Sequence, residues 1–476
     1  VQDYFPSQLL YNEKEYRKVD SVRRSILLKK SGMDFTTGSI MKKMLLFSWP
    51  ILLANLLQAS YQLIDSLWVG NLIGAHALGA VSLSSVIIFT VLSFIIGING
   101  ATLTVLSQQK GAQDEAGLKK SLNAFVVVLG LLSLFLGIVG FYLSPWLLTL
   151  LGTPEALFMM AQAYFMINFL GIIFLFGYNF IGTVLRALGD SKTPIRFVLI
   201  ATILNAVLDP LLIAGFGLGI YGAAYATVLA QGVAFVYGLV HSLKKAKVPF
   251  TIPHKPEKAY LITVMKLGLP GGLQMMAISA GMMAIMSVVA SFGEDVVAGY
   301  GAAQRLDSLI MLPAMTLGSA VNSMAGQNIG ANKWDRVTQI ARDGLLLIFT
   351  VTSFVSTIIF LGAELFIRIF VDHENTVRFG TMYLKTIAYF YPFLGVNFVL
   401  NGVVRASGAM FQVLVLNSIS FWVLRFPLTL ICARWFGELG IGIGMAASFV
   451  ISSIIASAYY KYGAWRRITL FASKGK

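Results

Sequence analysis

Long apolar segments separated by short polar ones make up most of the chain. A helix needs roughly 20 apolar residues to cross the hydrocarbon core of a bilayer, and each segment reaches that length. The segments are continuously apolar, whereas the strands of a membrane β-barrel alternate between apolar and polar residues. We therefore predict an all-α integral membrane protein with twelve transmembrane helices. They are expected at residues 44–68, 79–107, 122–143, 157–180, 194–214, 222–243, 261–291, 298–326, 343–366, 381–403, 411–433 and 441–463.

Landmarks of the first half of the chain return in the second half at a spacing near 220 residues. The matches keep their order: Pro50 with Pro270, Gln108 with Gln327, Tyr164 with Tyr383, Arg186-Ala187 with Arg405-Ala406, and Pro210 with Pro427. Six spans per half give both halves the same orientation in the membrane. We therefore expect two pseudo-symmetric six-helix bundles, a parallel repeat related by an axis along the membrane normal.

Composition divides the chain into five segments. They are a polar N-terminal tail at 1–40, an N-terminal six-helix lobe at 41–243, a basic cytosolic linker at 244–260, a C-terminal six-helix lobe at 261–464 and a C-terminal tail at 465–476. The N-terminal tail lacks the apolar core of a cleavable signal peptide. A native cytosolic tail and an appended extension both fit it, and we assign it no function.

Lysine and arginine outnumber the acidic residues by 36 to 21, which gives a formal net charge of +15. The basic residues gather in the two tails, in the linker and in the loops that follow the even-numbered spans. By the positive-inside rule, both termini lie in the cytosol. Arg186 and Arg405, in equivalent inner loops, are interpreted as topology anchors. Because membrane topology accounts for the charge, we expect no nucleic-acid partner.

Composition also limits the chemistry. The chain is 57% hydrophobic and 12% charged, with a mean hydropathy of +0.77, so most of its surface must face lipid. One cysteine, Cys432, and four scattered histidines supply no metal-ligand spacing. The sequence contains no Walker A loop, nucleophile elbow or dinucleotide fingerprint. We expect no metal, no cofactor and no enzymatic activity.

Two acidic residues within predicted spans are candidates for function, because an ionisable group inside a membrane is costly. Asp65 lies near the outer end of span 1, and Asp209 lies in the outer half of span 5. Each ends a polar stripe on one helix face. The stripes consist of Asn55, Gln58, Tyr61 and Asp65 in span 1 and of Thr202, Asn205 and Asp209 in span 5, with Asn179 of span 4 as a further candidate.

If spans 1 and 5 adjoin, Asp65 and Asp209 share a poorly hydrated pocket. Mutual repulsion and desolvation then both favour the protonated carboxyl, as a proton carrier requires. The structural alternative places Asp65 at the water interface and has Asp209 cap or hydrogen-bond a neighbouring helix. We favour a proton or cation site, because each acid belongs to a polar stripe.

The second half lacks this arrangement, since Phe426 stands where the first half has Asp209. Span 8 carries Arg305 and Asp307, which face different ways on a helix. We expect Arg425 of span 11 to pair with Asp307. This set is open to two interpretations, a structural ion pair or a role in substrate binding or coupling.

Several of these motifs resemble the multidrug and toxic compound extrusion transporters. The motifs are Trp49-Pro50, Asp65-Ser66-Leu67-Trp68-Val69-Gly70, Arg186-Ala187-Leu188-Gly189-Asp190 and Asn205-Ala206-Val207-Leu208-Asp209-Pro210. The resemblance covers about residues 40–465 and is greatest to the DinF-like bacterial branch. It implies two six-helix bundles around a central cavity, a multi-pass location in the bacterial plasma (inner) membrane, and antiport of drugs against a cation.

The resemblance also suggests roles for residues. In DinF-like relatives the acids of spans 1 and 5 are associated with protonation, which carries onto Asp65 and Asp209 here. Asn179, Thr202 and Asn205 would be their polar neighbours. The sodium-coupled NorM-like branch uses acids on spans 7 and 10, whereas span 7 of this chain has Gln274 and span 10 has no acid. This departure favours protons over sodium, and sodium at the first-lobe acids remains the alternative.

We therefore expect a monomeric secondary antiporter that exports apolar, often cationic compounds in exchange for protons. Its partners would be amphipathic drugs and membrane lipid. A flippase for lipid-linked precursors, or a polysaccharide exporter of the same superfamily, is the nearest alternative; such proteins tend to have more spans and a more cationic central cavity. An integral membrane enzyme would need a catalytic cluster at the membrane surface, and the sequence offers none.

Overall fold

The structure is a computed structural model that describes residues 32–471. The first lobe contains α2 (Ile40–Leu72), α3 (Ala75–Gly111), α4 (Glu115–Leu150), α5 (Glu155–Leu170), α6 (Ile172–Ala187), α7 (Lys192–Pro210), the π-helical turn η1 (Leu211–Gly215) and α8 (Gly219–Lys244). The second lobe contains α9 (Lys258–Ala290), α10 (Glu294–Gly330), α11 (Trp334–Arg368), α12 (Glu374–Ala388), α13 (Tyr391–Ala406), α14 (Met410–Ser418), the π-helical η2 (Ile419–Arg425), α15 (Phe426–Phe436), α16 (Leu439–Tyr462) and the short η3 (Ala464–Arg467).

The expected twelve spans in two six-helix bundles are confirmed. Within residues 32–471, ten helical segments are long and apolar enough to cross a membrane, and two bent helix pairs bring the number to twelve. The pairs are α5 with α6, bent by 49°, and α12 with α13, bent by 54°. Each pair is the fourth span of its lobe, so the two bends occupy equivalent positions in the repeat.

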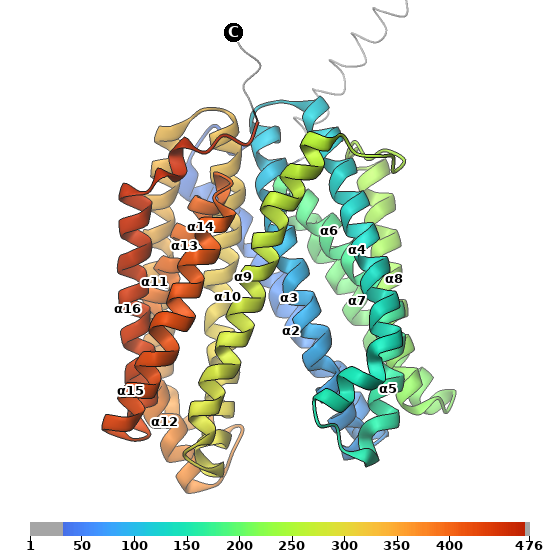
Figure 1. Ribbon diagram of the computed structural model, residues 1–476, viewed down its shortest axis with the longest axis vertical. Helices are drawn as coiled ribbons and strands as arrows, with labels where there is room; N and C mark the ends of the chain where they lie inside the picture. The colour runs from blue at the N-terminus through green and yellow to red at the C-terminus, as the bar shows by residue number, and fades with distance from the viewer. Residues whose placement is uncertain (1–31, 472–476) are drawn as a thin grey trace, which may run out of the picture.

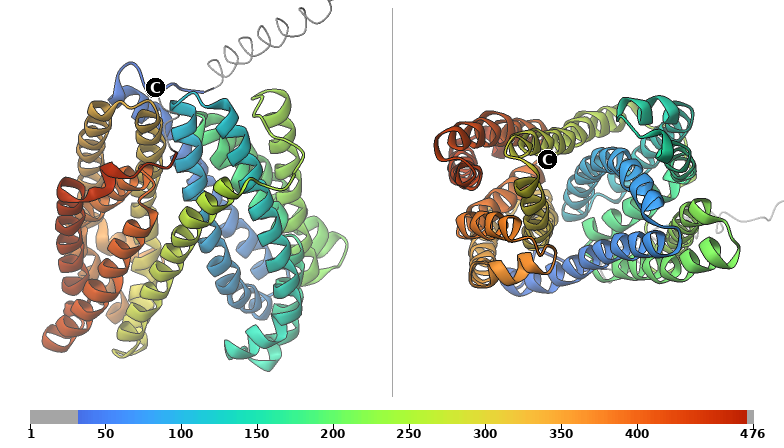
Figure 2. Two further views of the ribbon diagram at one scale, coloured as in Figure 1. Left: turned by 45° about the horizontal axis from the view of Figure 1, so that its top comes forward. Right: turned by 90° about the horizontal axis from the view of Figure 1, so that it is seen from below.

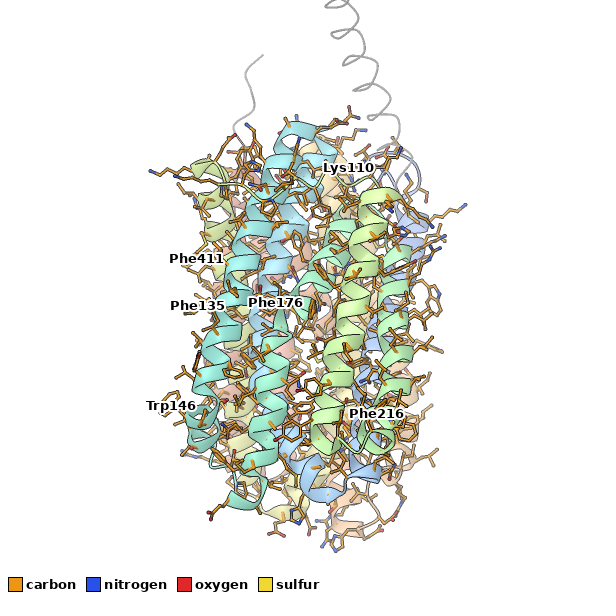
Figure 3. All side chains as sticks on the ribbon, turned by 90° about the vertical axis from the view of Figure 1, so that its right-hand side faces the viewer. Lys110, Phe135, Trp146, Phe176, Phe216 and Phe411 are labelled. Carbon is orange, nitrogen blue, oxygen red and sulfur yellow. The ribbon has the colours of Figure 1, made fainter. Side chains whose placement is uncertain are left out.

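The outer surface of the bundles is apolar along most of its length. Exposed aromatic side chains such as Phe135, Trp146, Phe216 and Phe411 lie around the helices, whereas Lys110 lies at one end of the molecule (Figure 3). A soluble protein rarely exposes such a wide apolar surface, and lipid is its natural solvent.

The two lobes meet at one end and diverge toward the other (Figure 1; Figure 2, left). We call the end where they meet the terminal end, because the described chain both begins and ends there. The linker between α8 and α9 also lies at the terminal end, as an even number of spans per lobe requires.

Hydrogen bonds close the terminal end along a line that we call the seam. The amide of Gln108 on α3 donates to the Ala406 carbonyl at 2.6 Å. The amide of Gln327, at the equivalent position on α10, donates to the Ala187 carbonyl at 3.0 Å. The seam therefore obeys the same pseudo-two-fold symmetry as the lobes.

Two glycines allow the helices to approach this closely. A Cβ atom at Gly111 would lie 1.9 Å from the carbonyl oxygen of Gln327, and one at Gly330 would lie 1.9 Å from that of Gln108. Both neighbours are backbone atoms, which cannot move aside as a flexible side chain can. Only glycine fits at these two positions of the closed seam.

The last part of the polar N-terminal tail expected at 1–40 packs against both lobes. Residues 32–38 lie across the seam, and residues 1–31 are outside the described range. The Met33 amide donates to the Gly189 carbonyl at 2.9 Å in the first lobe, and the Phe35 amide donates to Gln327 Oε1 at 3.2 Å in the second. Fully buried Phe35 supplies the apolar contact that holds this segment.

The C-terminal tail predicted at 465–476 is also partly packed. Trp465 is fully buried and its ring stacks on Tyr460, with the centroids 5.3 Å apart. This indole is buried at the terminal end of the second lobe. Its large apolar surface is removed from water there, which holds the segment in place. Residues 472–476 are outside the described range.

Candidate functional site

The first lobe encloses two buried carboxylates in its half distant from the terminal end. Asp65 on α2 is 6% exposed and Asp209 on α7 is fully buried. The Thr227 hydroxyl on α8 donates to Asp65 Oδ1 at 3.2 Å, and the Tyr164 hydroxyl on α5 donates to Oδ2 at 3.5 Å. Four helices of the first lobe thus surround one acidic cluster.

Asn205 connects the two acids. Its amide donates to Asp209 Oδ1 at 3.0 Å, one helical turn along α7, and its side chain also interacts with the Asp65 carboxylate. The carboxylates lie close enough to repel each other. Oδ2 of Asp209 has no hydrogen-bond partner in the described part of the chain. A buried, unpaired carboxylate oxygen is costly when charged, so the geometry suits a group that binds a proton.

The local backbone of α7 is irregular just beyond this site. Pro210 has no backbone N–H, and the chain continues as the π-helical turn η1. Single π-helical turns are rare and occur often at functional sites. The second lobe has its own π-helical segment, η2, in the corresponding span, ahead of Pro427.

The predicted polar neighbours divide into two groups. Tyr61 joins the acidic cluster, with a buried hydroxyl that has no hydrogen-bond partner in the described structure. Gln58, one turn away on α2, accepts a hydrogen bond from the Tyr178 hydroxyl at 3.0 Å. These two residues therefore continue the polar region from Asp65 toward α6.

The other three predicted neighbours lie apart from the acids or bond elsewhere. Asn55 donates across the lobe interface to Thr316 on α10 at 3.0 Å. Asn179 and Thr202 each donate to a carbonyl one turn back on their own helix, at 2.8 and 2.9 Å. For Asn55 and Thr202, a place on the same helix face as an acid did not predict these partners. A polar stripe longer than two helical turns contacts more than one part of the protein.

Sequence reasoning missed Tyr164 and Thr227, the two hydroxyl donors to Asp65. A single threonine in an apolar span gives no signal, since such side chains usually bond to their own backbone. Tyr164 did give one, because it matches Tyr383 in the repeat. A tyrosine kept in both halves of a membrane repeat is therefore a useful indicator.

In the second lobe, the expected ion pair between Arg425 and Asp307 is not formed as a direct contact. Asp307, 8% exposed, accepts hydrogen bonds from the hydroxyls of Tyr383, at 3.1 Å, and Tyr391. Arg425 donates to Ser448 at 3.3 Å instead. Two buried phenols thus supply the hydrogen bonds of this carboxylate, while the buried Arg425 bonds elsewhere.

The guanidinium of Arg425 is held by aromatic rings. Its central carbon lies 3.9 Å from the ring centroid of Phe421 and 4.6 Å from that of Phe449. A cation between two ring faces is stabilised by their electron density, more so where water is excluded. Arg425 thus packs within the second lobe, close to Asp307 but without touching it.

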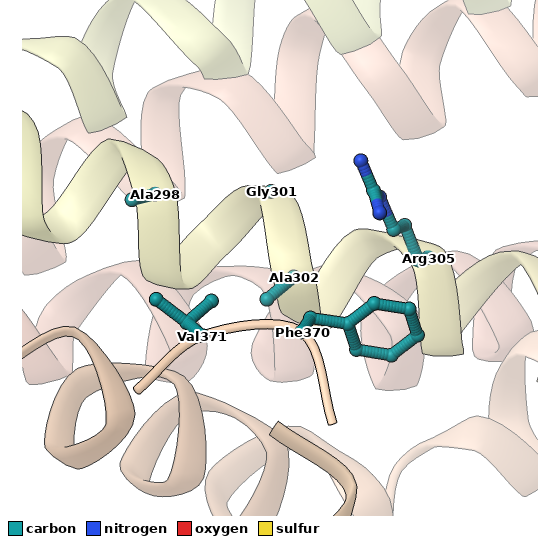
Figure 4. A pocket seen from close by; sticks show the side chains of 6 residues that line it. All are labelled: Ala298, Gly301, Ala302, Arg305, Phe370 and Val371. Carbon is teal, nitrogen blue, oxygen red and sulfur yellow. The ribbon is translucent and has the colours of Figure 1, made fainter. Parts of the chain in front are cut away.

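Arg305 faces away from Asp307, as expected. It is exposed and lies 5.4 Å from the centroid of the Phe370 ring, in the loop between α11 and α12. Both residues line an open pocket of about 280 Å³, together with Ala298, Gly301, Ala302 and Val371 (Figure 4). The pocket belongs to the second lobe and includes none of the first-lobe acids.

Comparison with known proteins agrees with the repeat and with the fold. The model of the MatE family matches the chain twice, at residues 50–211 and 270–431, one match in each lobe. The chain belongs to the MatE family, the multidrug and toxic compound extrusion transporters. Because the two MatE matches begin 220 residues apart, they reproduce the spacing found within the sequence.

Among MatE relatives, the "Probable multidrug resistance protein YpnP" of Bacillus subtilis is 57% identical over 93% of this chain and 99% of its own length. The "Probable multidrug resistance protein YoeA" of the same organism is 31% identical over 90% of this chain and 95% of its own length. A solved outward-facing MATE transporter has a TM-score of 0.85 at 22% identity, over 92% of this chain and 98% of that one. This last likeness shows the fold.

Proposed function

We propose that this MatE chain is a secondary antiporter that exports small amphipathic compounds, often cationic, in exchange for protons carried by Asp65 and Asp209. The observation that supports proton coupling is the cluster itself. Two buried carboxylates share Asn205, and one oxygen of Asp209 lacks a hydrogen-bond partner among the described residues. The names of the relatives support multidrug export.

The direction of transport follows from the proposed orientation. We place the terminal end in the cytosol, because the basic loops gather there. The lobes then diverge toward the outside, on which side Asp65 and Asp209 lie. Protons would reach the acids from outside while the lobes stand apart there, and an alternating-access change would open the other end.

Coupling requires only that proton and exported compound favour different conformations. A difference of about 1–3 kcal/mol is typical of such coupling between sites. Protonation removes a buried negative charge between α2 and α7, so it changes how these helices pack. The chain needs no nucleotide for this cycle, since the proton gradient supplies the free energy.

The test is transport by purified protein in liposomes, with ethidium as the probe and with proton and sodium gradients imposed in turn. Asp209→Asn keeps the shape of the side chain but cannot release a proton. We expect it to fold and bind ethidium, and to lose all response to the proton gradient. Asp372→Asn, in an exposed loop, is the matched control.

The outcomes separate the alternatives. Export by Asp209→Asn that still follows the pH gradient in full would place the proton elsewhere. Export by the unmodified protein that follows only the sodium gradient would replace the proton with sodium. Asp65→Asn should behave like Asp209→Asn.

A further inference from the structure

Arg186 and Arg405 occupy equivalent places in the two lobes, but they are not loop residues as we expected. Each lies in the last helical turn before the seam, Arg186 on α6 and Arg405 on α13. Each is partly exposed, whereas its immediate neighbours in the chain are buried. Membrane topology alone does not require a charged residue inside a packed helix end.

The side chain of Arg405 points away from the terminal end. Its backbone carbonyl accepts a hydrogen bond from Thr104 at 3.2 Å, which places the residue at the seam. Gly100 lies on α3 one turn before Thr104, and so farther from the terminal end. A Cβ atom at Gly100 would lie 3.7 Å from the Cδ atom of Arg405 and 3.8 Å from its Nη1 atom. The Arg405 side chain therefore lies against α3 of the other lobe, at the boundary between the lobes.

Arg186 repeats this geometry from the other lobe. Its carbonyl accepts a hydrogen bond from Ser323 on α10 at 2.9 Å, again at the seam. Its Nη2 donates to Thr183 Oγ1 at 2.9 Å, one turn farther from the terminal end on α6. Both side chains thus run from the seam away from the terminal end, one in each lobe. We call this pair the arginine floor.

No counter-charge accompanies the arginine floor. Between residues 32 and 471, no carboxylate oxygen lies within 4.0 Å of either guanidinium. The Nε atom of each is buried and has no hydrogen-bond partner in the same range. A cation at a helix C-terminus interacts favourably with the helix dipole, but this gain is smaller than the cost of desolvating a charge inside a membrane protein.

We propose that the arginine floor binds the anionic group, a carboxylate or a phosphate, of an amphipathic molecule at the boundary between the lobes. Guanidinium presents a planar fork of donors that matches either anion. Gly100 has no side chain and leaves room beside Arg405. The proposal rests on the proposed export function, because it assigns part of what the protein binds. It adds anionic amphiphiles to the cationic compounds proposed above. The arginine floor lies near the terminal end, whereas Asp65 and Asp209 lie in the opposite half of the first lobe.

Binding of a matched pair of probes to the purified protein in detergent tests the proposal. The probes are 11-(dansylamino)undecanoic acid and its primary amide, which differ only in charge. We expect the acid to bind at least about tenfold more tightly, and Arg405→Gln or Arg186→Gln to reduce this preference to near unity. Arg434→Gln, an exposed arginine at the other end of the second lobe, should preserve it.

Two sources of the anion are distinguished by a second measurement. If a lipid headgroup is the occupant, native mass spectrometry should show phosphatidylglycerol retained by the unmodified protein and lost from Arg405→Gln. If Arg405→Gln retains phosphatidylglycerol as the unmodified protein does but loses the preference for the acid probe, the occupant is a soluble carboxylate. Arg405→Lys keeps the charge without the fork; it should retain part of the preference, and it replaces the glutamine variant if that fails to fold.

Equal affinity of the unmodified protein for acid and amide, with no arginine-dependent lipid, would overturn the proposal. These measurements use no gradient, so they do not depend on proton coupling. Asp209→Asn should keep the preference for the acid. Loss of proton-driven export with an intact preference would separate the two proposals in one variant.

Discussion

Tyr164 and Tyr383 occupy equivalent positions in the two lobes, and each donates its hydroxyl to a buried aspartate of its own lobe. Tyr164 bonds to Asp65 at 3.5 Å and Tyr383 bonds to Asp307 at 3.1 Å. The tyrosines obey the repeat but the aspartates do not, since Asp65 is on the first span of its lobe and Asp307 on the second. The lobes thus share a donor and differ in the helix that carries the acid.

The first prediction concerns the donor to Asp65 on α8. Thr227→Val is nearly isosteric and removes the hydroxyl that bonds to the ionised carboxylate at 3.2 Å. Because the ionised form loses stabilisation and the protonated form does not, the pH profile of export should move to higher pH. Export measured across a series of external pH values checks this.

The control for this change is Thr350→Val, on an exposed face of α11, where the hydroxyl bonds only to its own helix. It should leave the profile in place. An unchanged profile in Thr227→Val would show that the Asp65 proton is not part of the rate-limiting equilibrium.

The second prediction distinguishes Asp307 from Asp65, the two buried aspartates that accept hydrogen bonds from tyrosines. Asp307→Asn places an amide N–H₂ or a neutral oxygen against two phenol donors, so it weakens bonds to a charged acceptor. We expect a loss of about 1–3 kcal/mol in stability, with transport per folded molecule little changed. Thermal unfolding in detergent and transport of normalised samples check both parts.

Asp372→Asn again serves as the exposed control. A stable Asp307→Asn protein without transport would contradict the structural role and move coupling into the second lobe.

The limits of the sequence are visible at Asp307. Hydropathy predicted the span that carries it, and the i, i+2 rule predicted that Arg305 would face elsewhere. The partner was wrong, because an arginine on a neighbouring span is only one of several donors that can reach a buried acid. Tyr391 lies close to a helix bend that no apolar count reveals.

The seam shows a second limit. Apolar length predicts where a helix crosses the membrane, but it does not locate the end of one helix relative to a helix in the other lobe. Arg186 and Arg405 were therefore assigned to loops. Residues 32–38 are polar enough to resemble a tail, yet one buried ring, Phe35, and several backbone hydrogen bonds fix them.

The third prediction concerns orientation. Lys255, in the exposed linker between α8 and α9, lies at the terminal end, which we place in the cytosol. In a background without Cys432, Lys255→Cys should resist an impermeant thiol reagent added to intact cells and react once the cells are opened. Glu155→Cys, exposed at the other end, should react in both cases. Ready labelling of position 255 in intact cells would reverse the assigned direction of transport.

The fourth prediction concerns the seam, where Gly111 meets the Gln327 carbonyl. In Gly111→Ala the added Cβ would lie 1.9 Å from that oxygen, which no side-chain rotation relieves. The clash exists only while the terminal end is closed, so it raises the free energy of that conformation and leaves the alternative one unaffected. The population should shift toward molecules that are open at the terminal end. Export should fall, because the cycle must pass through both conformations.

Spin labels at Lys119→Cys and Asp335→Cys, in exposed positions of the two lobes near the seam, report this change once Cys432 is replaced. The distance distribution should gain a longer component in Gly111→Ala, and Gly330→Ala should produce the same shift, since its Cβ would meet the Gln108 carbonyl at the same 1.9 Å. Gly130→Ala on α4 is the control, because a Cβ there meets nothing within 4 Å. Identical distributions in all four proteins would mean that the helices separate at these glycines without cost. The hydrogen bonds of Gln108 and Gln327 would then form as a result of closure of the terminal end and would not be its cause.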